Sequence, residues 1–221
     1  MSPDDRFVRL SNLLGSGNPI GGIWFVGLEP GGEWKSEHEI DRFIEKVGDR
    51  QYDCYDAGDT EVVKWRISPI ISKICHQITG NERSWEDYRS NRYQTKDGDF
   101  FASNLYPIAR PNRSDTPHSY NAWFGYADEK EYVSRVRDDG RFGKIRAYWK
   151  ASMPKITICH GKEKWTAFEE ILELGSPISE LDKGKIIEFP CGIFLTPHLS
   201  RATHMPDQRI DKLVTQARKY W

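Results

Sequence analysis

The feature that most constrains this chain is a short apolar run closed by glycines, GIWFVGL at residues 22–28. The run is too short for a typical helix and lacks the alternation of a strand with one face in water. It therefore predicts a strand buried on both faces, as in a parallel sheet. A turn with the sequence GLEPGG, Gly27 to Gly32, ends this strand. We expect the functional site to be built on that turn.

Further short apolar runs predict more strands, and helical patterns separate them. The strands are DFFASNL at 99–105, KITIC at 155–159, and a KIIEF–GIFLT pair split by the Pro190–Gly192 turn. The helical patterns cover 4–14, 36 to about 47, 60–78 with a restart at Ser68-Pro69, 129–152 broken at Gly140 or Gly143, 162–174 and 206–221. Alternating strands and helices predict an α/β fold of three layers, α/β/α, around a mostly parallel four-stranded sheet. No linker or repeat interrupts the chain, so residues 1–221 are expected to form one domain.

Composition narrows the choice of partners. The formal net charge is −1, so any contact with nucleic acid needs a local positive patch. No apolar run approaches the roughly 20 residues of a membrane span, and the N-terminus lacks the apolar core of a signal peptide. The four cysteines are scattered, without the paired spacing of a zinc site. We expect a cytoplasmic monomer with no metal and no membrane contact.

In a parallel sheet, ligands bind outside the carboxyl ends of the strands. Four predicted strands end in GLEPGG, SNLYP, HGKEKW and TPHLSR. Most of these ends carry polar residues that favour turns and are capable of chemistry. They are expected to converge on one crevice.

In this order and spacing, these strand ends resemble the motifs of the uracil-DNA glycosylase superfamily over residues 22 to 205. That family has a G-x-x-P-G turn after its first strand, here Gly27 to Gly31, and an asparagine after its second, here Asn104. A small-residue turn and helix follow the third strand, and an H-P-S motif follows the fourth, here His198 to Ser200. Glu29 takes the third position of the first motif, where members carry Asp or Asn, and Leu199 replaces the middle proline of the last.

The resemblance implies a DNA glycosylase that needs no cofactor and flips a deaminated base out of the duplex. Glu29 would activate water, and His198 would donate a hydrogen bond to the departing base. The Asn104 amide, with one acceptor and two donors, suits the N3–O4 edge of uracil. The expected remainder of the base pocket is Gly27, Leu28, Pro30, Gly31 and the stacking ring of Trp34, with Phe43 as the other candidate ring.

The same resemblance implies residues that contact DNA. Ser200 and Arg201 would bind phosphate, with His204 close by, and the segment from Arg201 to Met205 would fill the gap left by the flipped base. Arg110 and Arg113, in the long loop after Asn104, would add local positive charge.

Two other functions remain open at this stage. The chain is also compatible with a glycosylase-like domain that binds nucleic acid or a partner without cleaving a bond. A glycine-rich turn after a strand also suits phosphates, so a hydrolase of nucleotides or other small molecules is the third possibility.

Overall fold

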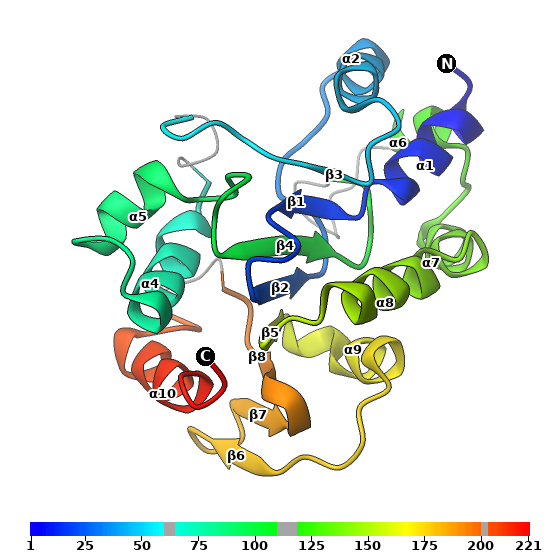
Figure 1. The fold of residues 1–221 in the computed structure, drawn as a ribbon. Coiled ribbons are helices and arrows are strands. Elements are labelled where there is room, and N and C mark those ends of the chain that lie inside the picture. The colour runs from blue at the N-terminus through cyan, green and yellow to red at the C-terminus, as the bar shows by residue number, and fades with distance from the viewer. Residues whose placement is uncertain (60–64, 110–118, 200–202) are drawn as a thin grey trace.

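The computed structural model describes residues 1–59, 65–109, 119–199 and 203–221. Within them the chain forms one mixed β-sheet with helices against both faces, so the α/β prediction is confirmed (Figure 1). The strand order is β3-β1-β4-β2-β5-β8-β7-β6. The bounds are β1 Gly15–Gly17, β2 Ile23–Gly27, β3 Tyr52–Asp53, β4 Phe100–Asn104, β5 Ile156–His160, β6 Ser179–Leu181, β7 Ile186–Phe189 and β8 Ile193–Thr196.

The prediction of a four-stranded, mostly parallel sheet is wrong, because the described sheet has eight strands and is mixed. Strands β4, β2, β5 and β8 are neighbours and run parallel. Outside them, β1 pairs antiparallel with β4, and β7 pairs antiparallel with β8 and β6. The added strands β1, β3 and β6 are two or three residues long, and β1 consists of Gly-Ser-Gly. Such short strands carry no apolar pattern that a sequence could show.

The helices form two layers. The bounds are α1 Pro3–Asn12, α2 Glu37–Val47, α4 Ser68–Thr79, α5 Trp85–Asn91, α6 Ser119–Phe124, α7 Glu129–Asp138, α8 Arg141–Ser152, α9 Trp165–Leu172 and α10 Asp207–Ala217. Buried side chains of α4, α5 and α10 form one core with one face of the sheet, and those of α1, α2 and α6 to α9 form a second core with the other face. Figure 1 shows the first group on the left and α7 to α9 on the right.

Strand β2 explains why the sheet needs both layers. Trp24 and Val26 belong to one core, whereas Ile23 and Phe25 belong to the other, and all four side chains are at most 1% exposed. Side chains alternate across a strand, so an uninterrupted apolar run buries one set on each face. The sequence GIWFVGL therefore fixes β2 as a central strand.

The predicted helix signals are also present where they can be checked. Ser36 caps α2, since its hydroxyl accepts from the Glu39 amide at 3.2 Å. Helix α4 begins at the predicted Ser68-Pro69 restart, and the 129–152 region breaks at Gly140, whose φ is +72°. Left-handed backbone of this kind suits glycine.

The order of connections places a switch point at β2. The chain passes from β2 to its neighbour β4, then crosses to β5 on the opposite side of β2. Helices α4 and α5 of the first connection lie on one face, whereas α2 of that connection and α8 of the second lie on the other. In open α/β sheets a crevice forms where the connections diverge in this way, outside the carboxyl ends of the strands. The ends of β2 and β5 flank that switch point.

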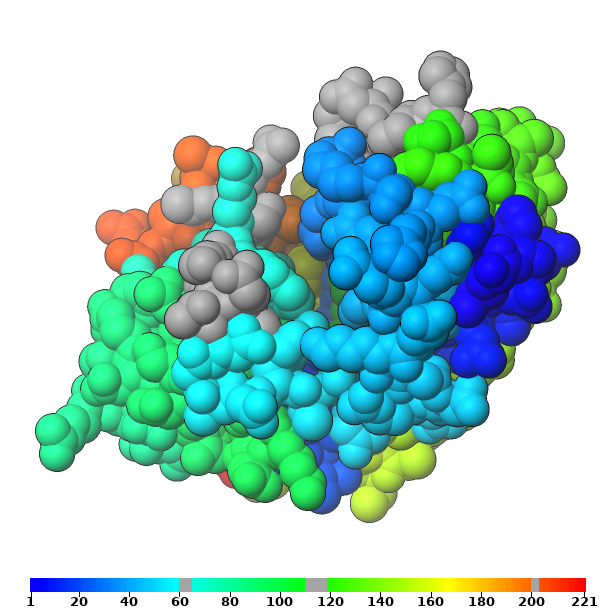
Figure 2. Space-filling model, turned by 90° about the horizontal axis from the view of Figure 1, so that it is seen from above, coloured from blue at the N-terminus to red at the C-terminus, as the bar shows by residue number. Residues whose placement is uncertain are grey.

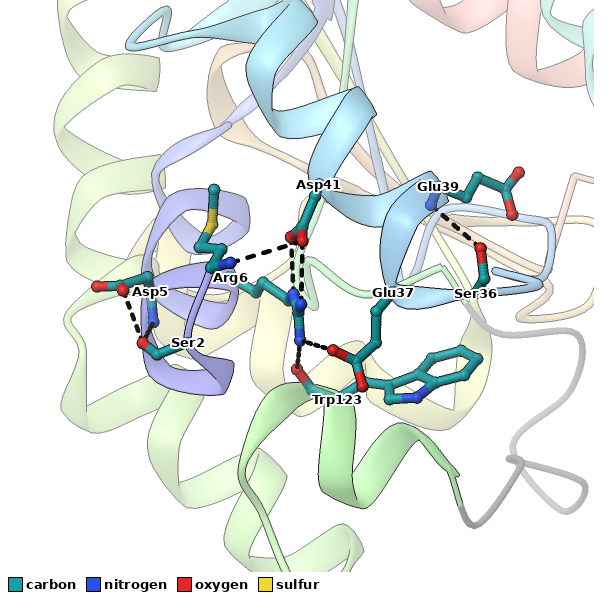
Figure 3. Close-up of polar contacts among 9 residues, drawn as sticks. Ser2, Asp5, Arg6, Ser36, Glu37, Glu39, Asp41 and Trp123 are labelled. Atoms are coloured by element: carbon teal, nitrogen blue, oxygen red, sulfur yellow. Dashed lines mark hydrogen bonds and ion pairs between the residues drawn. The ribbon is translucent and has the colours of Figure 1, made fainter.

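At one corner of the molecule, α1 is held by a network of charged groups (Figure 3). Arg6, only 4% exposed, donates to both carboxylate oxygens of Asp41 at 2.7 and 3.0 Å and to the carbonyl oxygen of Trp123 at 3.4 Å. The same guanidinium pairs with Glu37 at 2.6 Å. These contacts join α1, α2 and α6. Figure 2 views this side of the molecule from above, with α2 in blue beside the cyan segment that follows it.

Candidate functional site

Hydrogen bonding brings the carboxyl ends of the four parallel strands level with one another. Gly27 lies beside Asn104 in the register of β2 and β4, and His160 lies beside Thr196 in that of β5 and β8. The β2–β4 ladder continues past the strands, since the Leu105 amide donates to the Gly27 carbonyl at 3.0 Å. Gly27, Asn104 and His160 are therefore fixed by the sheet itself, as a preorganised site requires.

Gly27 is where the side chains of β4 and β5 come together. A Cβ atom built on Gly27 would lie 2.6 Å from Asn104 Oδ1, and 2.8 and 2.9 Å from Cε1 and Nε2 of His160. Real Cβ atoms essentially never approach other atoms under 3.0 Å, so only glycine fits this position without moving its neighbours. The amide of Asn104 and the imidazole of His160 thus face the same point over the bare Cα.

His198, the predicted leaving-group residue, joins this cluster through His160. The two rings meet edge to face, with centroids 5.2 Å apart and planes at 88°. His198 is half-buried just after β8, whereas His160 is only 5% exposed. The structure therefore brings two of the predicted site residues, Asn104 and His198, close to one buried histidine.

Sequence reasoning missed His160 as a functional residue. The histidine stands at the predicted strand end HGKEKW, but side-chain alternation alone does not reveal what lies across a strand. Burial, and then the neighbouring His198, lower the pKa of His160 from 6.5 to about 3. The ring is therefore neutral near pH 7, with one N–H donor and one lone pair. Among the described residues, its Nδ1 is buried without a hydrogen-bond partner.

The turn after β2 has a closed and an open part. Leu28 is 6% exposed, and a Cβ built on Gly161 would lie 2.8 to 3.1 Å from its side-chain carbons, so the turns after β2 and β5 pack closely. Glu29 and Pro30 are half-buried, while Gly31 is exposed. A Cβ at Gly31 would meet nothing within 4 Å in the described part of the chain. Glu29, whose carboxylate is predicted to activate water, thus follows Gly27 by two residues. It stands between the packed Leu28 and the open backbone of Gly31.

A buried arginine holds the backbone of Asn104 in place. Arg141 of α8, 2% exposed, donates to the carbonyl oxygens of Asn104 at 2.7 Å and Leu105 at 3.0 Å. It also donates to the carbonyls of Ser11 at 2.7 Å and Leu13 at 3.0 Å, at the end of α1. Burial lowers the pKa of Arg141 to about 10, so it stays protonated at pH 7. The sequence shows this residue only as one of many charges on a helix.

The two candidate stacking rings pack on each other. Trp34 and Phe43 have ring centroids 5.3 Å apart, and the Trp34 amide donates to the Tyr120 hydroxyl at 2.6 Å. The indole Nε1 of Trp34 is buried and has no partner among the described residues. No contact described in the structure joins Trp34 to Gly27 or Asn104, so its role as the stacking residue stays a prediction.

Of the residues expected to contact DNA, Ser200, Arg201 and Arg110 lie outside the described residues, as does Arg113. His204 is described. It is half-buried in the turn before α10, and its carbonyl oxygen accepts from Arg209. None of its described contacts reaches the strand ends.

A hollow of about 560 Å³ lies elsewhere, between the ends of α1 and α2 and the side of α8. Its cations already have partners: Arg9 pairs with Asp49 at 3.1 Å, Arg50 pairs with Asp53 at 3.4 Å, and Lys144 donates to Asn12 at 2.8 Å. The residues at the strand ends do not line this hollow. We place the candidate site at the strand ends, because parallel sheets bind ligands outside the carboxyl ends of their strands.

No group of three or more His, Cys, Asp or Glu side chains among the described residues is arranged to hold a metal ion. None of the helices described is both long enough and apolar enough to cross a membrane.

Comparison with known proteins adds no relative: no protein-family model matches this sequence, and no curated protein matches it.

Proposed function

We propose that this chain is a DNA glycosylase-like enzyme that hydrolyses the N-glycosidic bond of uracil or a related deaminated base. The observation that carries the proposal is the convergence of Asn104 and His160 over the bare Cα of Gly27, with His198 against His160. This cluster lies at the switch point of the sheet, where α/β folds bind ligands. A base that enters the crevice meets hydrogen-bonding groups instead of an apolar wall.

Each residue has a defined part in the reaction. The Asn104 amide holds the base through its ring N–H and carbonyl edge. Glu29, as a carboxylate, accepts a proton from water as the water oxygen attacks C1′ of the deoxyribose. The bond between C1′ and the base nitrogen breaks, and its electron pair leaves with the base. His198 donates a hydrogen bond to the base oxygen on which the negative charge collects. The products are a free base and an abasic deoxyribose.

The turn after β2 supports entry of a nucleotide. Gly31 and Gly32 present backbone to open space, since a Cβ on either would meet no described atom within 4 Å. Backbone without side chains allows close approach of a ligand. Positive charge close to the crevice includes the exposed Lys162, two residues after His160. Such local charge is needed because the formal net charge is −1.

The test is incubation with oligonucleotides that contain uracil, hypoxanthine or xanthine, followed by alkaline cleavage at abasic sites. The wild-type protein is expected to cleave at least one of them. Glu29→Gln should lower the single-turnover rate about a hundredfold, as expected for loss of a general base. His198→Ala should cost a similar factor, because it removes a donor to the leaving group. Glu33→Gln and His38→Ala, at exposed positions nearby, serve as matched controls.

An abasic product that forms equally fast in Glu29→Gln would contradict the role of this carboxylate. DNA binding without any abasic product would exclude the glycosylase and leave the non-catalytic binding domain.

A hydrolase of free nucleotides is the second candidate, and the net charge of −1 favours it, because a small substrate needs no extended basic surface. Deoxyuridine and deoxyuridine monophosphate, assayed in parallel with the oligonucleotides, separate the two activities. Release of uracil from the free nucleotide but not from DNA would select the second.

A further inference from the structure

The histidine at the end of β5 has hydrogen-bonding capacity that its protein surroundings do not use. His160 is 5% exposed, and its Nδ1 has no partner among the described residues. Buried polar atoms in folded proteins are nearly always hydrogen-bonded, so each exception calls for a reason. The edge-to-face contact with His198 fixes the position of the ring without engaging either nitrogen in a described hydrogen bond.

The unpartnered Nδ1 leaves the tautomer of the ring open, and the other nitrogen of the ring lies beside Gly27. Its Cε1–Nε2 edge and Asn104 Oδ1 lie within 3 Å of the point where a Cβ of residue 27 would stand. Any side chain at that position would cover both atoms, and the residue there is glycine. Because β2 and β5 flank the switch point of the sheet, this pair of atoms lies at the place where such sheets bind ligands.

The chemistry of the pair defines the ligand that fits it. Asn104 Oδ1 is an acceptor and binds a ring N–H of a base. A neutral imidazole can present either N–H or a lone pair at Nε2, according to its tautomer, and no described group at Nδ1 selects one of them. A base with a carbonyl next to its N–H satisfies the Nε2–H form and the amide together. Uracil, hypoxanthine and xanthine have this edge, as do thymine and guanine, whereas cytosine and adenine in DNA have an amino group next to a bare ring nitrogen.

We propose that His160 is a specificity-determining residue of this site: its Nε2–H donates to a carbonyl oxygen of the base while Asn104 Oδ1 accepts from the neighbouring ring N–H. The site then accepts deaminated pyrimidines and purines through one shared edge. This inference rests on the proposed function for its substrate, but its base-binding step can be measured without catalysis.

Kinetics provide the first test. His160→Phe keeps a ring of similar size and removes the donor. It should raise KM about tenfold on uracil- and hypoxanthine-containing oligonucleotides and change kcat less than threefold, as expected for one lost hydrogen bond. His160→Gln restores an N–H donor and should stay within threefold of wild type. The control is His76→Gln, since His76 lies on α4 with its Nε2 3.0 Å from the Glu82 carbonyl oxygen. Wild-type KM in a folded His160→Phe protein would overturn the inference.

The second test uses the wild-type protein and so does not depend on the folding of a variant. Free uracil is added to protein labelled with ¹⁵N-histidine, and the ring nitrogens of His160 are followed by NMR. We expect a saturable shift of Nε2 toward its protonated tautomer with uracil and with hypoxanthine, and none with adenine, which has no carbonyl. A His160 spectrum that uracil leaves unchanged would overturn the inference.

The outcomes separate this inference from the proposed function. A wild-type protein that releases no base from DNA, yet shows the His160 shift with uracil, would contradict the proposed glycosylase activity and support recognition of the base by His160. Base release that persists in His160→Phe with unchanged KM would support the enzyme and overturn the role of His160.

Discussion

Two buried polar regions of this protein differ in how their buried polar groups are hydrogen-bonded. In the first, which we call the arginine corner, Arg6 and Arg141 tie α1 to α2, α6, α8 and the end of β4. Their guanidinium groups donate to carboxylates and backbone carbonyls of the chain itself. In the second, at the strand ends, a nitrogen of His160 is buried without a described partner.

This difference separates architecture from function. Buried groups that have hydrogen-bond partners stabilise the fold, because removing one of them leaves its partners buried without a hydrogen bond. A buried group without a partner reduces stability and calls for a reason. The guanidinium groups of the arginine corner are held by carboxylates and carbonyls of the chain, so we regard that region as structural. At the strand ends the ring with the unpartnered Nδ1 lies over Gly27 beside Asn104, so we place the site there. Arg141 links the two, because it holds the backbone carbonyl of Asn104.

The largest expected effect comes from breaking the arginine corner. Arg141→Met removes the donor to carbonyls of Asn104, Leu105, Ser11 and Leu13 together. Buried acceptors left without donors should lower the free energy of unfolding by about 3 to 5 kcal/mol. Urea denaturation measures the loss. Arg141→Lys keeps the charge but not the fork of donors and should recover only part of it. A loss below about 1 kcal/mol for the methionine variant would show that these carbonyls do not depend on Arg141.

The strand-end site should respond to pH instead. The pKa of His160 is lowered by burial, and then by His198, from 6.5 to about 3. Between these values the unfolded chain binds a proton that the folded protein does not, so stability falls as the pH falls. One such group contributes a slope of about 1.4 kcal/mol per pH unit.

His160→Gln cannot bind this proton, so the variant should lose stability less steeply than wild type between pH 6 and pH 4. Urea titrations of the two proteins at each pH give the difference, in which the contributions of other groups cancel. Parallel stability curves would mean that His160 is protonated in the folded protein and would contradict its neutral state.

Much of the fold could be predicted from the sequence. GIWFVGL, DFFASNL and KITIC lie within one residue of β2, β4 and β5, because a central strand buried on both faces needs an uninterrupted apolar run. The KIIEF and GIFLT pair also forms as predicted, as β7 and β8. The added strands could not be predicted, because only pairing with a neighbouring strand makes them strands. Gly-Ser-Gly at β1, for example, has no strand-forming pattern of its own.

The site could be predicted only in part, for a related reason. Strand ends can be read from the sequence, so Gly27, Asn104 and His198 could be named before the structure. Which residue of β5 meets Gly27 depends on the register of two strands 130 residues apart, and no local pattern encodes that register. The strand end that begins at His160 could be read from the sequence, but its contact with Gly27 and the role of Arg141 appear only once the sheet is assembled.

The most direct test of the account is base release by wild-type protein and by Gly27→Ala, measured side by side. The added Cβ must displace Asn104 Oδ1 and the His160 ring, at a cost in stability of about 1 to 3 kcal/mol. Gly143→Ala is the matched control, because a Cβ there meets no described atom within 4 Å. We predict that wild type and Gly143→Ala release uracil or hypoxanthine from DNA at equal rates. Folded Gly27→Ala should be at least tenfold slower. Equal rates for all three proteins, or no release by wild type, would contradict a base-excising site over Gly27.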